Sequence, residues 1–313
     1  MESGVTVLVT GATGRHGGTG AYVVRRLREH GIPVRALVRR LDERSERAAA
    51  LGAELVVGDL ADHRSLASAV DGVSSVYFTF PVDAGIVPAA ANYAQAVRET
   101  GGSPRTVVMS MGPATPTHPS HLGRHQWLSE QVLQWAGLDV TILRMAAMFH
   151  EDIPLLWKHS VRTESMIRNC FGENPVSWLN ALDAAEFCVA ALLRPELFAD
   201  KAAHYLPGPE VLDFHQITKV FGEVLDRPVG FEPISREAWL AELLDLAASP
   251  HAGLLKPDMA RHITACGHAV ANSLERGNAD YSDTGLFRRV TGREPVLVQD
   301  FLTSNADLFR PER

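Results

Sequence analysis

A glycine-rich turn between an apolar run and a helical pattern is the feature that most constrains how this chain can fold. Residues 5–9 form a short, largely β-branched run, and apolar residues return at helical spacing at Val23, Val24 and Leu27. Residues 10–20, between them, are mostly glycine and threonine. This order predicts a buried parallel strand, a tight turn and the start of a helix.

Such a turn can bind a phosphate group. Glycines let a phosphate approach the backbone without meeting a Cβ, and the free N–H groups at a helix start attract negative charge. Gly11, Gly14 and Gly17 have the G-x-x-G-x-x-G spacing, so we expect them to bind the pyrophosphate of a dinucleotide. Gly14, Gly17 and Gly20 have the same spacing, but the first set directly follows the strand. The structural alternative is an ordinary βα turn that happens to be rich in glycine.

Composition excludes several classes of protein. Hydrophobic residues make up 46% of the 313 residues and charged residues 21%, as is usual for a soluble globular protein. The net charge of −7, without a basic block, argues against nucleic acid as a partner. No apolar run is long enough to cross a bilayer, and no signal peptide precedes the first strand. Cys170, Cys188 and Cys266 are isolated and read as reduced thiols, so we expect a cytoplasmic protein that binds no membrane.

Strands and helices are predicted to alternate in the first half of the chain. This alternation implies an α/β fold, a Rossmann-type doubly wound parallel sheet. We expect residues 1–150 to form the NAD(P)-binding domain and residues 151–313 a smaller, mainly helical substrate region interleaved with the sheet. The expected strands are 33–38, 54–60, 75–81 and 106–110, with helices at 43–51, 65–70 and 89–100.

The second half is less regular. Helical periodicity is present at 183–193, 214–225 and 237–246, and residues 300–309 read as a closing helix. Residues 249–267 carry two prolines and scattered histidines without a clean period. We expect that segment to be a lid, a substrate-contacting helix pair or a stretch of low order.

The end of the second predicted strand bears on the choice of coenzyme. Arg39 and Arg40 stand directly after it, and Asp42 follows only later. In a dinucleotide fold an acidic residue at this place binds the free ribose hydroxyl of NAD, whereas an arginine accommodates the 2′-phosphate of NADP. The sequence therefore favours NADP (NADPH) over NAD. Arginines that only cap an exposed strand end are the alternative.

Four short motifs, taken in order, resemble the NmrA-like family, a group of atypical short-chain dehydrogenase/reductases. They are Thr10–Gly14, Leu37–Arg39, Val57–Leu60 and Thr141–Met145, and the resemblance continues through Val176–Asp183 and His204–Pro209. It implies a coenzyme bound at the turn and at the strand ends. The residues expected to bind it are Gly11, Thr13, Gly14, Arg15, His16, Gly17, Arg39, Asp59, Leu60, Thr79 and Phe80. Asp59 could instead cap the helix that follows it.

The resemblance also implies a place for catalytic residues. Short-chain dehydrogenases usually combine a serine with a Tyr-x-x-x-Lys pair that donates the proton. Ser110 ends the fifth strand, where the family has its serine, but the expected tyrosine and lysine positions hold Leu122 and Gln126. Leucine cannot donate a proton and glutamine carries no charge, so the usual proton relay is missing.

Histidines near these positions are the candidate replacements. His121 and His125 are four residues apart and would share a helix face, and histidine can supply a proton near neutral pH. Exposed loop histidines are the structural alternative. A metal site built from His118, His121 and His125 lacks an intervening glutamate or a nearby cysteine, so we expect no metal there.

A group of large apolar residues lies where the mouth of the sheet is expected. They could line a substrate pocket, but we expect at least half of them to be plain core. The group is Trp127, Met145, Met148, Phe149 and Trp157.

Taken together, the sequence predicts an NADP-dependent oxidoreductase that reduces a carbonyl, quinone or conjugated double bond of a small, fairly apolar molecule. The missing Tyr-Lys pair keeps open a non-catalytic NADP(H)-binding redox sensor that acts through a protein partner. An isomerase or cyclase on the same fold is a third alternative. A homodimer is an open alternative as well.

Overall fold

The computed structural model describes residues 5–14, 18–112, 114–146, 148–272 and 283–311. Within them the chain forms two compact units. The first comprises Met1–Pro116, Arg124–Arg144 and Ala181–His204, and the second comprises Thr117–Gly123, Met145–Asn180 and Tyr205–Arg313. The chain therefore passes between the units several times, and residues 181–204 belong with the first unit although they follow residue 150.

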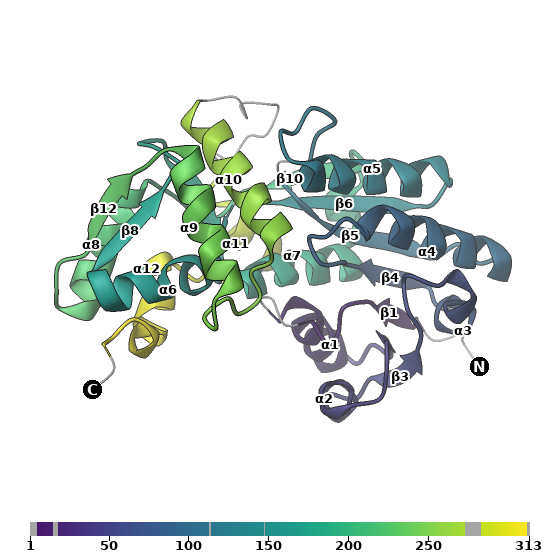
Figure 1. The fold of residues 1–313 in the computed structure, drawn as a ribbon. Coiled ribbons are helices and arrows are strands. Elements are labelled where there is room, and N and C mark those ends of the chain that lie inside the picture. The colour runs from purple at the N-terminus through teal and green to yellow at the C-terminus, as the bar shows by residue number, and fades with distance from the viewer. Residues whose placement is uncertain (1–4, 15–17, 113, 147, 273–282, 312–313) are drawn as a thin grey trace. The chain divides into compact units, whose positions relative to one another are not determined.

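The first unit is built around a seven-stranded sheet with the strand order β10-β6-β5-β4-β1-β2-β3 (Figure 1). Its strands are β1 (Val7–Val9), β2 (Val34–Val38), β3 (Glu54–Val57), β4 (Ser75–Phe78), β5 (Arg105–Met111), β6 (Val140–Met145) and β10 (Ala203–Leu206). β1 pairs in parallel with both β2 and β4, so that Val7 lies opposite Val34 on one side and Ser75 on the other. The strand order reverses between β1 and β4, which confirms the Rossmann-type fold. In such sheets ligands bind outside the carboxyl ends of the strands at this reversal, so the ends of β1 and β4 are the candidate site.

Helices cover both faces of this sheet. They are α1 (Thr19–Glu29), α2 (Glu43–Ala50), α3 (Ala67–Val70), α4 (Ile86–Thr100), α5 (His121–Trp135) and α7 (Ala181–Leu193), with a 3₁₀ turn at His63–Ser65. Tyr93 of α4 and Leu133 of α5 are buried in one cluster with Leu8 of β1 and Val108 of β5. On α1 and α7, apolar packing is joined by a buried polar contact. The Glu186 carboxylate of α7 accepts hydrogen bonds from two side chains of α1, the guanidinium of Arg26 at 2.9 Å and the hydroxyl of Tyr22 at 2.8 Å.

The second unit is mainly helical, as predicted. Its helices are α6 (Asp152–Glu164), α8 (Phe214–Leu225), α9 (Arg236–Ala248), α10 (Pro257–Ala271), α11 (Leu286–Thr291) and α12 (Val298–Ser304). Short strands form two small sheets, ordered β11-β9-β7 and β12-β8. These strands are β7 (Met148–Phe149), β8 (Met166–Asn169), β9 (Val176–Leu179), β11 (Glu210–Leu212) and β12 (Gly230–Pro233). No helix in the described part of the chain combines the length and the apolarity that a bilayer crossing requires.

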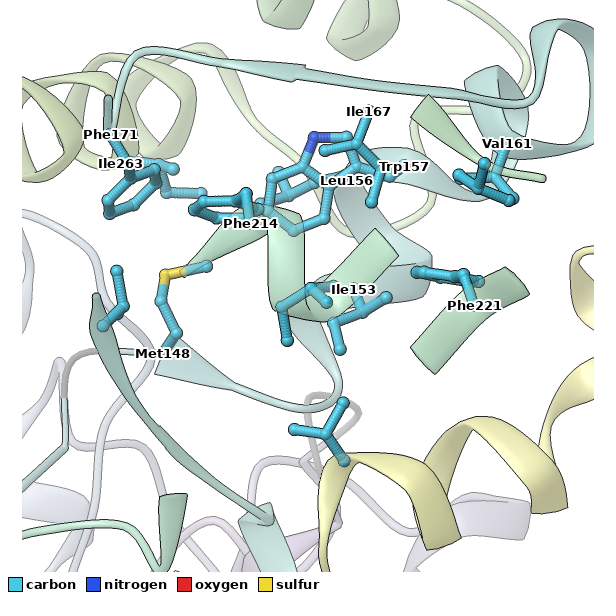
Figure 2. Close-up of a cluster of buried hydrophobic side chains, with 14 of the residues drawn as sticks. Met148, Ile153, Leu156, Trp157, Val161, Ile167, Phe171, Phe214, Phe221 and Ile263 are labelled. Carbon is cyan, nitrogen blue, oxygen red and sulfur yellow. The ribbon is translucent and has the colours of Figure 1, made fainter. Parts of the chain in front are cut away.

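Aliphatic and aromatic side chains together form the core of the second unit (Figure 2). The Trp157 ring stacks on Trp239 with 6.4 Å between centroids and meets Phe214 edge-on at 5.3 Å. Its indole N–H donates to the Arg168 carbonyl at 3.0 Å, so burial leaves that polar group satisfied. Of the large apolar residues grouped in the sequence, Met145, Met148 and Trp157 are buried, which confirms the expectation that most of them are core.

Of the alternatives expected for the segment 249–267, the structure shows a helical one, because α10 occupies residues 257–271. Pro257 stands at the start of the helix, where its missing N–H costs nothing. The buried face of α10 is formed mostly by alanine, glycine, threonine and histidine, which give a weak hydrophobic period. Small residues are required there, since a Cβ on Gly267 would lie 3.0 Å from Cys170 Sγ and 3.1 Å from Trp239.

Candidate functional site: the crevice at the ends of β1 and β4

The turn after β1 has a conformation that only glycine adopts easily. Gly11 has φ +69°, and a Cβ there would lie 2.6 Å from Cγ2 of Thr79. The Thr10 hydroxyl accepts from the Thr79 N–H at 2.8 Å and lies 2.9 Å from the Thr79 carbonyl oxygen. The ends of β1 and β4 are thus fastened together at the crevice, and Thr79 acts through its backbone there.

Gly20 makes the closest approach between the first helix and this turn. A Cβ on Gly20 would lie 2.3 Å from the Gly11 carbonyl oxygen. Because that oxygen belongs to the backbone, the clash could be relieved only by moving the turn or the helix. The helix begins only at Thr19, after Gly18 with φ +65°. The close helix–strand packing of a dinucleotide motif therefore falls on Gly20, which the sequence offered only in the alternative glycine frame. Gly17, the third glycine of the preferred frame, lies outside the described residues.

The start of α1 suits a phosphate group. The helix has no side-chain cap among the described residues, so its first N–H groups are left for another acceptor. Gly14 is exposed in the turn and Thr13 is half-buried. The residues present therefore fit the pyrophosphate of a dinucleotide. Arg15 and His16, also expected at this place, lie outside the described part of the chain.

The arginines after β2 differ in their surroundings. Arg40 is paired with Asp42 at 3.1 Å, and Asp42 also caps α2 by accepting from the Ser45 N–H. The neighbouring guanidiniums hold the pKa of Asp42 well below its usual range. Arg39 is exposed and makes no hydrogen bond or ion pair with the other described residues. Its charge is thus available to a ligand, whereas that of Arg40 is already engaged.

The residues expected at the ends of β3 and β4 make hydrogen bonds and packing contacts within the protein. The Asp59 carboxylate accepts from the Ala61 N–H at 2.9 Å within the turn after β3, whereas the cap of the following 3₁₀ turn is Asp62, so Asp59 does not have the capping role that the sequence left open. Leu60 is buried, and its carbonyl accepts from the Asn92 amide at 2.8 Å. Phe80 is half-buried and packs against the cluster under α3 and α4. Their expected contacts with the coenzyme remain predictions.

Ser110 lies in a buried polar network of the first unit. Its hydroxyl donates to the Glu130 carboxylate with 2.5 Å between the oxygens, and the Gln126 amide donates to Ser110 Oγ at 3.2 Å. Arg144 binds the other carboxylate oxygen of Glu130 at 2.5 Å. Burial raises the pKa of Glu130, while Arg144 and Ser110 act in the opposite direction. Sequence reasoning missed Glu130 and Arg144, which only the fold brings to Ser110.

The two positions where the family resemblance places the tyrosine and lysine of the proton relay hold Leu122 and Gln126. Leu122 is buried, and Gln126 is a buried amide whose donor is committed to Ser110. A neutral amide therefore replaces the lysine charge beside the serine, in agreement with the absence of the relay inferred from sequence.

The three histidines near the start of α5 do not form one set. The helix begins at His121, so His121 and His125 lie one turn apart on one side of it, and both are half-buried. His118 is buried and stacks on His262, with 5.3 Å between ring centroids. Within the described residues, the convergent metal-binding atoms belong to His118, His262 and Cys266.

Comparisons with known proteins agree on one family. A family model described as the NmrA-like family matches residues 3–256. An NAD(P)H azoreductase of Xenophilus azovorans is 31% identical over 74% of this chain and 78% of its own length. A (4-alkanoyl-5-oxo-2,5-dihydrofuran-3-yl)methyl phosphate reductase of Streptomyces griseus subsp. griseus is 28% identical over 98% of this chain and 100% of its own length.

Solved structures show the same fold. The NADPH-dependent quinone oxidoreductase QOR2 of Escherichia coli, complexed with NADPH, matches with a TM-score of 0.76 and 20% identity. The match covers 97% of this chain and 100% of the other.

Proposed function

Since this chain belongs to the NmrA-like family, we propose that it is an NADPH-dependent reductase. Its substrate is a small, fairly apolar molecule with a carbonyl, quinone or conjugated double bond. The carrying observation is the crevice at the ends of β1 and β4, with its glycine turn, the open start of α1 and the unengaged Arg39. Two relatives that cover most of the chain and are named as reductases support the proposal.

In this proposal each part of the crevice has a distinct task. Gly11 and Gly14 leave room for the pyrophosphate, and the first N–H groups of α1 donate to it. Arg39 binds the 2′-phosphate by charge-assisted hydrogen bonds. The nicotinamide supplies the hydride when the coenzyme is bound, and the protein aligns the acceptor with it.

The missing Tyr-Lys pair supports conjugated acceptors in particular. When hydride adds to a quinone or an enone, the resulting negative charge is delocalised, so immediate proton transfer from a strong donor is less important. In the proposed mechanism Ser110 orients the acceptor, with Glu130 fixing the serine hydroxyl. His125 or His121 is the proposed proton donor, because both stand near the start of α5 and imidazole is the side chain most often used for acid–base chemistry.

The test is to mix the full chain with NADPH and a panel of quinones, enones, aldehydes and azo compounds, and to follow the loss of nicotinamide absorbance. We expect turnover of at least one conjugated acceptor and a preference for NADPH over NADH. If neither coenzyme binds, as measured by fluorescence titration, the proposal fails at its first step.

One observation favours a second candidate, a redox sensor that binds NADP(H) without turnover. The Ser110 hydroxyl is engaged by Glu130 and Gln126, and no tyrosine or lysine occupies the relay positions. Tight NADPH binding with no loss of absorbance against the whole panel would support the sensor. Conversion of a substrate without coenzyme consumption would instead indicate isomerase or cyclase chemistry.

A further inference from the structure

Three side chains of the second unit direct nitrogen and sulfur atoms at one point. Nε2 of His118 and Nε2 of His262 each lie 3.6 Å from Sγ of Cys266. The ligand atoms of all three residues lie within 4.8 Å of one another. Both histidines are buried and Cys266 is half-buried, so the group is enclosed and still has a route to solvent.

Local structure explains why these residues meet. His262 and Cys266 are four residues apart on α10 and therefore lie on one face of the helix. His118 comes from the segment before α5 and stacks on His262 with 28° between the ring planes. Gly123 makes room for it, since a Cβ there would lie 2.3 Å from Cγ of the His118 ring.

Ser120 holds the far nitrogen of both rings. Its hydroxyl lies 3.0 Å from Nδ1 of His262, and its carbonyl oxygen lies 3.3 Å from Nδ1 of His118. Metal-binding histidines commonly donate their second N–H to a neighbouring acceptor, and the Ser120 hydroxyl and carbonyl oxygens are placed to accept from the two Nδ1 atoms. With both Nδ1 atoms engaged, the two Nε2 atoms are left to face Cys266.

The two nitrogen–sulfur distances match the corresponding edges of a zinc tetrahedron. With Zn–N bonds of about 2.0–2.1 Å and a Zn–S bond of about 2.3 Å, tetrahedral angles separate nitrogen and sulfur by about 3.6 Å. Imidazole and thiolate are the ligands that zinc prefers. We propose that His118, His262 and Cys266 form a Zn²⁺ site with three protein ligands and a fourth position open to water. This proposal departs from the sequence-based expectation of no metal, which was weighed on His118, His121 and His125, and it does not depend on the proposed reductase activity.

Binding of Zn²⁺ requires the loss of the Cys266 thiol proton and fixes the proton of each histidine at Nδ1. The Cys266 thiol gives up its proton to solvent, and the thiolate forms the Zn–S bond. Each histidine binds as a neutral ring through Nε2 and carries its proton at Nδ1. In the metal-free ring the Ser120 N–H donates to Nδ1 of His118 at 2.9 Å. In the loaded ring the Ser120 carbonyl is the acceptor for the His118 Nδ1 proton.

The experiment measures metal binding by the full chain without coenzyme. Chelator-treated protein is titrated with Co²⁺, which reports a thiolate ligand by charge-transfer absorption and a tetrahedral site by intense visible bands. Zn²⁺ then displaces the Co²⁺, with Mg²⁺ as the comparison ion. We expect one equivalent per chain, loss of the thiolate band in Cys266→Ser, and at least a tenfold weaker affinity in His262→Asn. Ser120→Ala should weaken binding about 10- to 100-fold.

Matched controls come from the same region. His268 lies on α10 beyond the cluster, and Cys170 is a buried thiol that donates to the Thr264 carbonyl instead. His268→Asn and Cys170→Ser should bind Zn²⁺ like the unchanged chain. Circular dichroism of each metal-free variant checks that it is folded.

A second measurement needs no variant. Zn²⁺, but not Mg²⁺, should slow the alkylation of Cys266 by iodoacetamide at least tenfold, as followed by peptide mass spectrometry. The inference is overturned if Zn²⁺ gives no such protection, if binding does not saturate near one equivalent, or if Cys266→Ser binds as tightly as the unchanged chain.

Discussion

The Ser110 hydroxyl donates to the buried Glu130 carboxylate, and Arg144 binds the same carboxylate from its other side. Glu130 is fully buried and Arg144 nearly so. Removing one partner of such a pair leaves the other charge without compensation, which costs about 3–5 kcal/mol. We therefore expect Glu130→Gln to lower the free energy of unfolding by that amount in urea denaturation. Ser110→Ala removes the hydrogen bonds to Glu130 and from Gln126 and should cost about 1–3 kcal/mol.

An exposed ion pair serves as the control for this prediction. Glu43 and Arg47 lie four residues apart on α2, and both side chains are largely exposed. Glu43→Gln should change the free energy of unfolding by less than about 0.5 kcal/mol. If Glu130→Gln costs no more than Glu43→Gln, the buried network does not stabilise the fold as described.

Arg39 is predicted to select the coenzyme. Replacing it by alanine removes charge-assisted hydrogen bonds to the 2′-phosphate, which are worth about 1.5–3 kcal/mol. NADPH affinity should fall about 10- to 100-fold in Arg39→Ala, while NADH affinity stays within about twofold. Fluorescence titration measures both. Arg40→Ala is the control, because Arg40 is paired with Asp42, and it should change NADPH affinity little. Equal losses for both coenzymes would remove Arg39 from the 2′-phosphate site.

His150 should make the stability depend on pH. The side chain is fully buried, and neither ring nitrogen has a hydrogen-bond partner among the described residues. Burial lowers its pKa to about 3, against about 6.5 in an unfolded chain. Between these values the unfolded state binds the extra proton, so stability is greatest above pH 6.5 and falls as the pH drops. The contribution of His150 to that slope approaches about 1.4 kcal/mol per pH unit.

The measurement compares urea denaturation at pH 7.5 and pH 5.0. His150→Leu cannot be protonated, so its stability should fall less over this interval than that of the unchanged chain. His215→Leu is the control, because His215 is exposed and paired with Glu173. An unchanged slope in His150→Leu would mean that the buried ring is not the proton-binding group.

Local patterns in the sequence predict much of the fold. The predicted helix 214–225 has the same bounds as α8. Its start is set by a local contact, because the Asp213 side chain caps the helix by accepting from the Gln216 N–H. The alternation of strands and helices predicts a parallel, doubly wound sheet, because parallel neighbours need a helical crossover between them. In contrast, the sequence left a helix at α10 as one of three alternatives, because its buried face is made mostly of small and polar residues.

The candidate sites likewise differ in whether local sequence or tertiary packing brings their residues together. The glycine turn directly follows β1 and Arg39 directly follows β2, and both strands can be recognised in the sequence. Their positions at the strand ends can therefore be predicted from sequence. The contact of Ser110 with Glu130 and of His118 with His262 joins segments that only tertiary packing brings together. The i,i+4 spacing of His262 and Cys266 is a local signal, but it has meaning only once residues 257–271 are known to be helical.

Gly20 carries the last prediction, because the first helix can reach the turn only without a side chain at this position. A Cβ there would lie 2.3 Å from the Gly11 carbonyl oxygen, which is a backbone atom and cannot turn aside as a side chain could, so α1 must move away. We expect Gly20→Ala to cost about 1–3 kcal/mol of stability and to weaken NADPH binding at least tenfold, because the N–H groups of α1 leave the pyrophosphate. Gly102→Ala is the matched control, since its nearest neighbour would be 3.6 Å away. Urea denaturation and coenzyme titration of both variants separate the two effects. Unchanged NADPH affinity in Gly20→Ala would show that the coenzyme does not depend on the position of α1.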